Sequence, residues 1–202
     1  MKGRKSESSE NLTVRKEREM KTLIFNGSPR AKGDTVSLIN MVTENIKGEY
    51  KLVNAYRCDI SPCVDCRYCW KNSGCAIKDE MQDVYAYIQE CDNIVIASPL
   101  YFSELTGKLL DVGSRLQTYF SAGFLRKEKC IEKPKKGAVV LVGGGSGGMD
   151  KAYDTACILL HDMNCRDIRK VFFNNTDTTP AIANELAVEE LKDIIRYFNE
   201  EE

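Results

Sequence analysis

Short apolar segments alternate with helical patterns along most of this chain, and this alternation restricts the fold most strongly. Strand-like runs cover residues 21–26, 50–56, 93–99, 136–145 and 167–174. After each run, apolar residues at helical spacing predict helices over 34–46, 79–91, 107–120, 149–163 and 184–200. Strands that alternate with helices form βαβ units, which require a parallel sheet with helices on both faces. We therefore expect an α/β fold with an open parallel sheet of five strands.

The size and composition of the chain fit one globular domain. At 202 residues it is long enough for a single well-packed core. With 29 basic and 30 acidic residues the formal net charge is -1, which does not favour a nucleic-acid or membrane surface. No apolar leader segment is present, so we expect a cytoplasmic protein, where nine cysteines favour metal binding or redox chemistry over structural disulfides.

Residues 1–20 differ in composition from the rest of the chain. They are densely charged and contain too few apolar residues to bury a face, so we expect a mobile tail. The folded domain is then expected over 21–202, with a cysteine-rich insertion at 58–78.

Three unusual loops follow predicted strands, and in open α/β sheets ligands bind beyond the carboxyl ends of the strands. The first loop reads "NGSPRAKGDT" and opens a helix. Ser28, Thr35 and the backbone N–H groups at the helix start suit an anion, and Arg30 and Lys32 add positive charge. The glycine spacing is not that of a Walker loop, so the loop predicts a phosphate without a magnesium-bound nucleoside triphosphate. The alternative is an ordinary capped turn.

The second loop, "SPLYF", follows the third predicted strand. Pro99 restricts the backbone and leaves neighbouring N–H groups available to a ligand. Tyr101 and Phe102 offer aromatic surface for a planar ring, or else pack beneath the following helix.

The third loop, "GGGSGG", matches the G-x-G-x-x-G pattern of dinucleotide-binding folds through Gly143, Gly145 and Gly148. It follows the fourth strand and not the first, and the next strand ends in asparagine where a ribose-binding carboxylate would be expected. Both departures argue against a dinucleotide site. A glycine-rich loop also lets the backbone approach the edge of a flat ring.

Four closely spaced cysteines form the clearest metal-binding pattern, C-x2-C-x2-C-x5-C, at Cys63, Cys66, Cys69 and Cys75. Such thiols can converge on one iron–sulfur cubane through a curled loop. The bacterial ferredoxin run has three residues before its last cysteine and a proline after it, whereas this chain has five residues and Ala76. Three occupants stay open: an iron–sulfur cluster, a structural zinc ion, or free thiols that can form disulfides.

Together, "GSPRAKGDT", the segment ending "CAIKDEM", "SPLYF" followed by "GKLLDVGSR", and "GGGSGG" make the chain similar to a known family. In this order the motifs resemble the flavodoxin-like NAD(P)H-dependent FMN reductase family, in its iron–sulfur flavoprotein-like subgroup. The resemblance covers 21–199 and implies the strand order 2-1-3-4-5 with bound FMN at the carboxyl edge. It implies these cofactor-binding residues: Ser28, Arg30, Lys32, Gly33, Asp34, Thr35, Ser98, Pro99, Leu100, Tyr101, Phe102, Gly144, Gly145 and Ser146. Asp34 departs from the asparagine expected there, because a carboxylate repels a phosphate unless its oxygens accept hydrogen bonds from N–H groups.

The resemblance also implies an activity. An FMN-dependent oxidoreductase would pass electrons from NAD(P)H or ferredoxin through FMN to a quinone, a flavin, an oxygen species or a protein. The four clustered cysteines would hold a [4Fe–4S] cluster, and no side chain is assigned as catalytic. Relatives are homodimers or homotetramers with the flavin near a subunit interface. The alternatives are a flavodoxin-like electron carrier without turnover, and a flavin scaffold with a structural zinc site.

Overall fold

A single parallel sheet of five strands forms the centre of the computed structural model, which describes residues 19–200. Its strand order is β2-β1-β3-β4-β5, so the predicted α/β class and the predicted order are confirmed. The strands are β1 Lys21–Asn26, β2 Glu49–Asn54, β3 Asn93–Pro99, β4 Lys135–Val142 and β5 Cys165–Phe173. The described residues do not include 1–18 of the predicted tail or 201–202 of the predicted domain.

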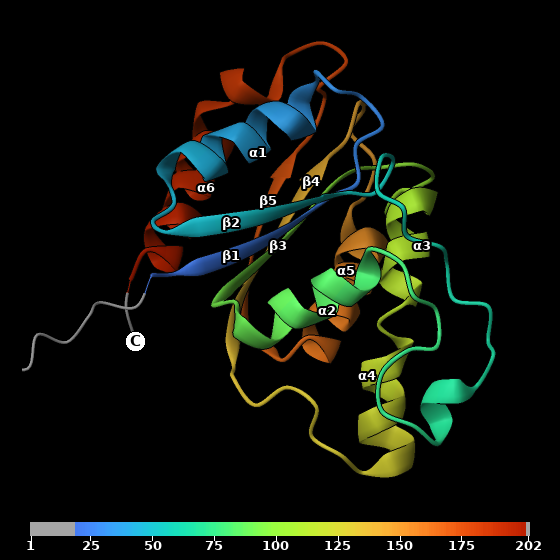
Figure 1. Cartoon of the computed structure of the whole chain (residues 1–202). Coiled ribbons are helices and arrows are strands. Elements are labelled where there is room, and N and C mark those ends of the chain that lie inside the picture. Colours follow the sequence, from blue (N-terminus) through green and yellow to red (C-terminus); the bar gives the residue numbers. More distant parts are fainter. Residues whose placement is uncertain (1–18, 201–202) are drawn as a thin grey trace, which may run out of the picture.

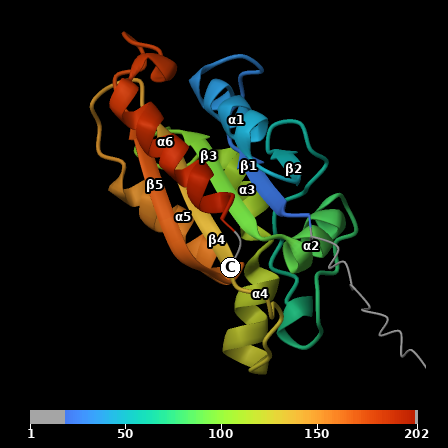
Figure 2. The same ribbon diagram turned by 90° about the vertical axis from the view of Figure 1, so that its left-hand side faces the viewer.

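Helices cover both faces of the sheet. Figures 1 and 2 show α1 and α6 on one side and α2, α3 and α5 on the other. The helices are α1 Asp34–Asn45, α2 Met81–Glu90, α3 Gly107–Ser114, α4 Gln117–Ser121, α5 Asp150–Asp162 and α6 Glu185–Phe198. Within residues 19–200, every helix is too short or too polar to cross a lipid bilayer.

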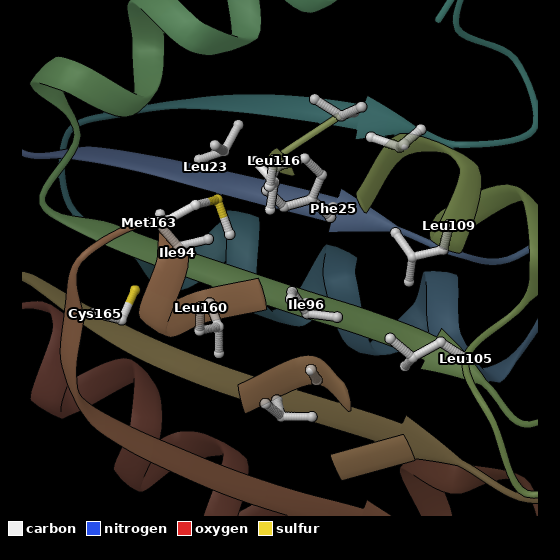
Figure 3. Close-up of a cluster of buried hydrophobic side chains, with 14 of the residues drawn as sticks. Leu23, Phe25, Ile94, Ile96, Leu105, Leu109, Leu116, Leu160, Met163 and Cys165 are labelled. Atoms are coloured by element: carbon white, nitrogen blue, oxygen red, sulfur yellow. The ribbon is translucent and has the colours of Figure 1, made fainter. Parts of the chain in front are cut away.

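Two apolar layers fill the space between the sheet and the helices. Beneath α1 and α6, Leu38 and Leu191 pack against sheet residues such as Ile24 and Val140. On the other face, Leu23, Phe25, Ile94 and Ile96 meet side chains from α2, α3 and α5 (Figure 3). Because β1, β3 and β4 contribute to both layers, they read as unbroken apolar runs in the sequence.

The helix predicted over 107–120 is interrupted. It divides into α3 and α4, with Arg115 and Leu116 between them. The amides of Arg115 and Leu116 donate to the carbonyls three residues earlier, at 3.1 and 2.9 Å, which tightens the chain into a turn. Contacts with residues 61–79, which lie far away in the sequence, favour this break, as described below.

The parallel strands place three loops at one edge of the sheet. The β1–α1 loop, the loop after β3 and the glycine loop after β4 all follow carboxyl ends of hydrogen-bonded neighbours. The segment between β2 and α2 instead runs down beside α4, away from the body of the sheet (Figures 1 and 2). The fold therefore creates two separate regions of chemical interest.

Candidate flavin cavity and cysteine cluster

A cavity of about 340 Å³ lies where the three loops meet at the carboxyl edge of the sheet. It is lined by Ser28, Pro29, Arg30, Gly33, Asp34, Thr35, Pro99, Leu100, Tyr101, Val142, Gly144, Gly145, Thr176 and Asp177. Ten of these fourteen are among the residues predicted to bind a cofactor. The predicted residues Lys32, Ser98, Phe102 and Ser146 do not line it.

One wall of the cavity is the N-terminus of α1. No side chain caps this helix at Gly33, and its first residues, Asp34 and Thr35, line the cavity. The first N–H groups of a helix have no partner within the helix, and together with the helix dipole they attract an anion. Arg30, exposed at the mouth, adds a positive charge. This wall can bind a phosphate.

The loop that forms this wall is held by side chains of β1. Asn26 Nδ2 donates to Asn54 Oδ1 at 2.7 Å, and Asn26 Oδ1 accepts from the amide of Ser28 at 2.9 Å. Gly27 is required by close packing, because a Cβ there would lie 2.8 Å from Ser98 Oγ. The buried side chains of β1 thus fix the start of the loop before it reaches the cavity.

Asp34 has a partner other than the cavity. Its Oδ1 accepts a hydrogen bond from the amide of Ala181 at 2.7 Å. Ala181 lies in the segment before α6, so the carboxylate connects α1 to a distant loop. This contact explains how an acidic side chain can stand beside a phosphate-binding wall.

The loop after β3 forms the second wall through Pro99, Leu100 and Tyr101. The Tyr101 amide donates to the Glu104 carbonyl at 3.0 Å, and the Glu104 amide donates to the Tyr101 carbonyl at 3.1 Å, which closes a two-residue turn. Phe102 and Ser103 in that turn have φ values of 55° and 58°, a strained conformation for residues with side chains. The Phe102 side chain is fully exposed at the tip.

Ser98 is completely buried and supports this wall from behind. Its Oγ donates to the Pro99 carbonyl at 2.8 Å and accepts from the Thr106 amide at 3.3 Å. Thr106 Oγ1 in turn donates to the carbonyl of Gly27 at 2.8 Å. Ser98 therefore braces the loop after β3 from within, and Thr106 joins this loop to the β1–α1 loop, without Ser98 lining the cavity.

The third wall pairs the glycine loop with residues that the sequence reasoning missed. Thr176 and Asp177, in the loop after β5, line the cavity and donate backbone hydrogen bonds to Gly143 and Gly144, both at 3.1 Å. A Cβ at Gly144 would lie 2.5 Å from Asp177 Oδ2, so any larger residue there would displace the Asp177 side chain. The available signal was their position directly after the fifth parallel strand, at the ligand-binding edge.

The four clustered cysteines line a second, small cavity of about 20 Å³ in the segment between β2 and α2. It is also lined by residues of the α3–α4 turn, including Arg115 and Thr118. Cys63 and Cys66 are exposed, and Cys69 and Cys75 are half-buried. Within the described residues, no three histidine, cysteine or acidic side chains converge closely enough to hold a single metal ion.

Arg115 closes the segment that carries the cysteines. Its side chain is buried, and its guanidinium donates to the carbonyls of Ser61 at 2.9 Å and Ile77 at 3.2 Å. These two residues flank the first and last clustered cysteines. Nη1 also donates to Asp79 Oδ2 at 2.6 Å, so the charge of the buried arginine is balanced. One side chain thereby holds both ends of the cysteine segment together.

The charges of this pair are maintained by their contacts. Burial alone would raise the pKa of Asp79, but hydrogen bonds from Arg115 and from the amides of Ser61 and Met81 outweigh it and hold the pKa below its ordinary value. Burial alone would lower the pKa of Arg115, and the bond to Asp79 reverses this effect. Both groups are therefore ionised near neutral pH.

Further contacts attach the segment to the helices beside it. The amide of Cys63 donates to Ser114 Oγ at 2.9 Å, and the Cys69 thiol donates to Ser121 Oγ at 3.5 Å. Arg126 Nη1 donates to the carbonyl of Cys69. The break between α3 and α4 is what brings Ser114 and Arg115 to the cysteines, which gives the physical reason for the interrupted helix.

Known proteins share both the sequence pattern and the fold. A family model for NADPH-dependent FMN reductase matches residues 20–179, most of the chain. The chain belongs to this family. An FMN reductase of this family carries out NAD(P)H-dependent oxidoreduction with FMN as its cofactor, so the predicted class of enzyme and the predicted cofactor are confirmed.

Among proteins with curated names, iron–sulfur flavoproteins are similar to this chain. One from Methanocaldococcus jannaschii is 30% identical over 148 residues, which cover 71% of this chain and 70% of that protein. Another, from Methanosarcina thermophila, is 28% identical over 147 residues, covering 71% and 72% of the two chains. These relatives confirm the predicted likeness to iron–sulfur flavoproteins.

Solved structures confirm the flavodoxin-like fold of this chain. An NAD(P)H:quinone oxidoreductase from Methanothermobacter marburgensis superposes with a TM-score of 0.71 and 18% identity, covering 92% of this chain and all of that one. An FMN-dependent NADH-azoreductase from Bacillus anthracis in complex with FMN has a TM-score of 0.59 and 16% identity, covering 90% of this chain and all of that one.

Proposed function

We propose that FMN binds in the cavity at the carboxyl edge of the sheet, with its phosphate at the N-terminus of α1. The uncapped N–H groups of α1, the Ser28 hydroxyl and Arg30 fit a phosphate. The flavin ring would lie between Tyr101 on one side and Gly144 and Gly145 on the other. Asp177, beside Gly144, would face the edge of the ring.

The chain contributes positioning to the reaction. Bound FMN would supply hydride acceptance from NAD(P)H and electron donation to an acceptor. Pro99 and Leu100 would exclude water from one face of the ring. The amides of the first turn of α1 would hold the phosphate, and Thr106, whose amide donates to Ser98 Oγ, would keep the two loops at a fixed separation through its hydrogen bond to the Gly27 carbonyl.

We further propose that Cys63, Cys66, Cys69 and Cys75 hold a [4Fe–4S] cluster. The single observation that supports this assignment is that all four side chains line one cavity, and Arg115 holds the two ends of its segment together. Four cysteine thiolates are a ligand set that [4Fe–4S] clusters use, and relatives named iron–sulfur flavoproteins support the cluster over zinc.

The resulting function is that of an oxidoreductase that joins two-electron and one-electron chemistry. NAD(P)H delivers electrons in pairs, and an iron–sulfur cluster held by the four cysteines would supply single-electron transfer to an acceptor such as a ferredoxin. The flavin cavity and the cysteine cavity share no lining residue. We therefore expect a homodimer or homotetramer to bring the two centres within electron-transfer distance.

The test compares acceptors in two cysteine variants purified without oxygen. Cys66→Ser should remove the cluster, retain FMN and retain NAD(P)H-dependent reduction of a quinone, but lose at least 90% of ferredoxin reduction. Cys58→Ser is the matched control, because Cys58 lies in the same segment but does not line the cysteine cavity. It should retain iron, FMN and both activities.

Two results would contradict the proposal. If Cys66→Ser reduces ferredoxin as fast as the unmodified protein, the cluster is not on the path. If the purified protein binds FMN but oxidises neither NADH nor NADPH with any acceptor, it is an electron carrier without turnover.

A further inference from the structure

Arg115 has a buried N–H group that nothing in the described structure satisfies. The residue is 1% exposed, and its Nε atom has no hydrogen-bond partner. The other side of the guanidinium is well bonded: Nη1 donates to Ser61 and Asp79, and Nη2 donates to Ile77. Buried donors are paired in almost all native proteins, so an orphaned one indicates a missing acceptor.

The position of Arg115 indicates where that acceptor lies. Arg115 lines the same small cavity as Cys63, Cys66, Cys69 and Cys75. Its bonds to Ser61, Ile77 and Asp79 fix the plane of the guanidinium from three directions, so the side chain cannot turn away to find water. The group that fills the cysteine cavity is therefore the natural partner of Nε–H.

We propose that Arg115 Nε–H donates a hydrogen bond to a sulfur atom of the cluster and thereby raises its reduction potential. The inference rests on the [4Fe–4S] assignment above and extends it to a positioning and tuning residue. Cluster sulfur carries negative charge and accepts N–H hydrogen bonds, which are among the factors that set cluster potentials. Arg115 would thus play two parts, since it closes the cysteine segment and stabilises the electron that the cluster receives.

The direction of the effect follows from charge. Reduction adds one electron to the cluster, breaks no bond, and draws that electron from NAD(P)H through FMN. Because Asp79 balances the charge of Arg115, the Nε–H donor itself is what would stabilise the more negative, reduced form of a cluster whose sulfur accepts its hydrogen bond. Removing the donor should therefore make the cluster harder to reduce.

A measurement on the unmodified protein tests the hydrogen bond directly. The full chain is produced with arginine carrying ¹⁵N only at Nε, purified without oxygen, and analysed for iron, sulfide and FMN. Because Arg67 also lines the cavity, pulsed electron paramagnetic resonance of the reduced cluster should show a ¹⁵N coupling that is retained in Arg67→Lys. This coupling should disappear in a second sample, made with unlabelled arginine. A cluster-containing protein without the coupling would overturn the proposal.

Redox titration of variants tests the consequence. Arg115→Lys keeps the positive charge and can still reach Asp79, but it lacks the Nε donor. We expect it to retain iron and FMN. At a fixed potential, its ratio of reduced to oxidised cluster should be at least tenfold lower, which corresponds to a decrease of about 59 mV in the reduction potential for one electron. Lys71→Gln is the matched control, because it removes an exposed positive charge from the same segment and should shift the ratio less than twofold.

The outcomes separate this proposal from the one on which it rests. If the unmodified protein binds FMN but contains no iron, both the cluster and the Arg115 bond are wrong. If iron is present and Arg115→Lys leaves the potential unchanged, only the Arg115 assignment fails. If Arg115→Lys loses its iron, the ¹⁵N coupling in the labelled, unmodified protein still decides whether Arg115 donates to the cluster.

Discussion

Asp34 Oδ1 accepts a hydrogen bond from the backbone N–H of Ala181 at 2.7 Å, across 147 residues of sequence. This bond connects the first residue of α1 to the segment that precedes α6. It also engages one of the two carboxylate oxygens of Asp34 in a hydrogen bond to a distant loop. Asp34 therefore stabilises the contact between α1 and this distant segment at the edge of the flavin cavity. Its negative charge, in contrast, repels a phosphate.

Replacing Asp34 by asparagine separates these two effects. In Asp34→Asn the side-chain carbonyl can still accept from Ala181, while the negative charge beside the phosphate is removed. We expect FMN to bind about five- to tenfold more tightly, a gain of about 1 kcal/mol. Fluorescence titration of flavin-free protein measures this affinity.

The controls for this prediction come from the same chain. Asp150 is the first residue of α5, is exposed and does not line the flavin cavity, so Asp150→Asn should leave the affinity for FMN unchanged. Asp34→Ala should instead lower the free energy of unfolding by about 1 kcal/mol, because it removes the bond to Ala181. Weaker FMN binding in Asp34→Asn would mean that the carboxylate helps to hold the ligand.

A methyl group at position 144 should disturb the third wall of the cavity. In Gly144→Ala the new Cβ would lie 2.5 Å from Asp177 Oδ2, so the Asp177 side chain must move. We expect the dissociation constant for FMN to rise at least tenfold. Gly147→Ala in the same loop is the comparison, because nothing lies within 4 Å of its Cβ. Equal affinities in the two variants would place the flavin ring elsewhere.

Two core cysteines make the protein sensitive to alkali. Burial raises the pKa of Cys91 to about 11 and that of Cys165 to about 12. Below the unfolded pKa of about 8.5 the thiol is protonated in both states, and the stability of the protein is fully retained. As the pH rises from there towards the folded pKa, the unfolded state loses its proton while the folded state keeps it, so the free energy of unfolding falls. At pH 9.5 the loss should be about 1 kcal/mol per thiol.

Urea unfolding at pH 7.5 and 9.5 measures this loss. In Cys91→Ala the fall in unfolding free energy between the two pH values should be smaller than in the unmodified protein by about 1 kcal/mol. The comparison is made within each variant, so the cavity left by the substitution cancels. An identical fall in both proteins would show that Cys91 does not contribute.

Thiol labelling should reveal the ligands of the cluster. Cys63 and Cys66 are exposed, so iodoacetamide should modify them within minutes in protein stripped of iron. In protein that contains the cluster, all four clustered cysteines should be at least tenfold slower, since their thiolates bind iron. Peptide mass spectrometry reads each site, with Cys157 on α5 as an internal reference. Equal labelling of the four sites with and without iron would contradict the assignment.

Much of the fold could be predicted from local patterns. The unbroken apolar runs of β1, β3 and β4 and the helical spacing between them predicted the parallel sheet, because both reflect burial of nearby residues, while the strand order came from the family resemblance. The loops after β1, β3 and β4 were expected at one edge for the same reason. Ten of the residues predicted to bind a cofactor line one cavity there, although their contact with FMN remains a prediction.

The features that sequence reasoning missed all depend on distant contacts. The break between α3 and α4 is stabilised by hydrogen bonds of Ser114 and Arg115 to Cys63 and Ser61, more than fifty residues away. Thr176 and Asp177 reach the cavity only because β5 pairs with β4. Ser98 was expected at the ligand but is turned inward by its bond to Thr106. No local pattern contains these relationships.

An anaerobic absorption spectrum of freshly purified protein, combined with iron, zinc and acid-labile sulfide analysis, tests whether the chain carries both FMN and an iron–sulfur cluster. We expect one FMN, about four irons and four sulfides per chain, with flavin bands over a broad cluster absorption. Flavin bands with zinc, or with no metal, would contradict the cluster and leave an FMN reductase with a zinc site or free thiols. A colourless protein that also fails to bind added FMN would contradict the proposed site as a whole.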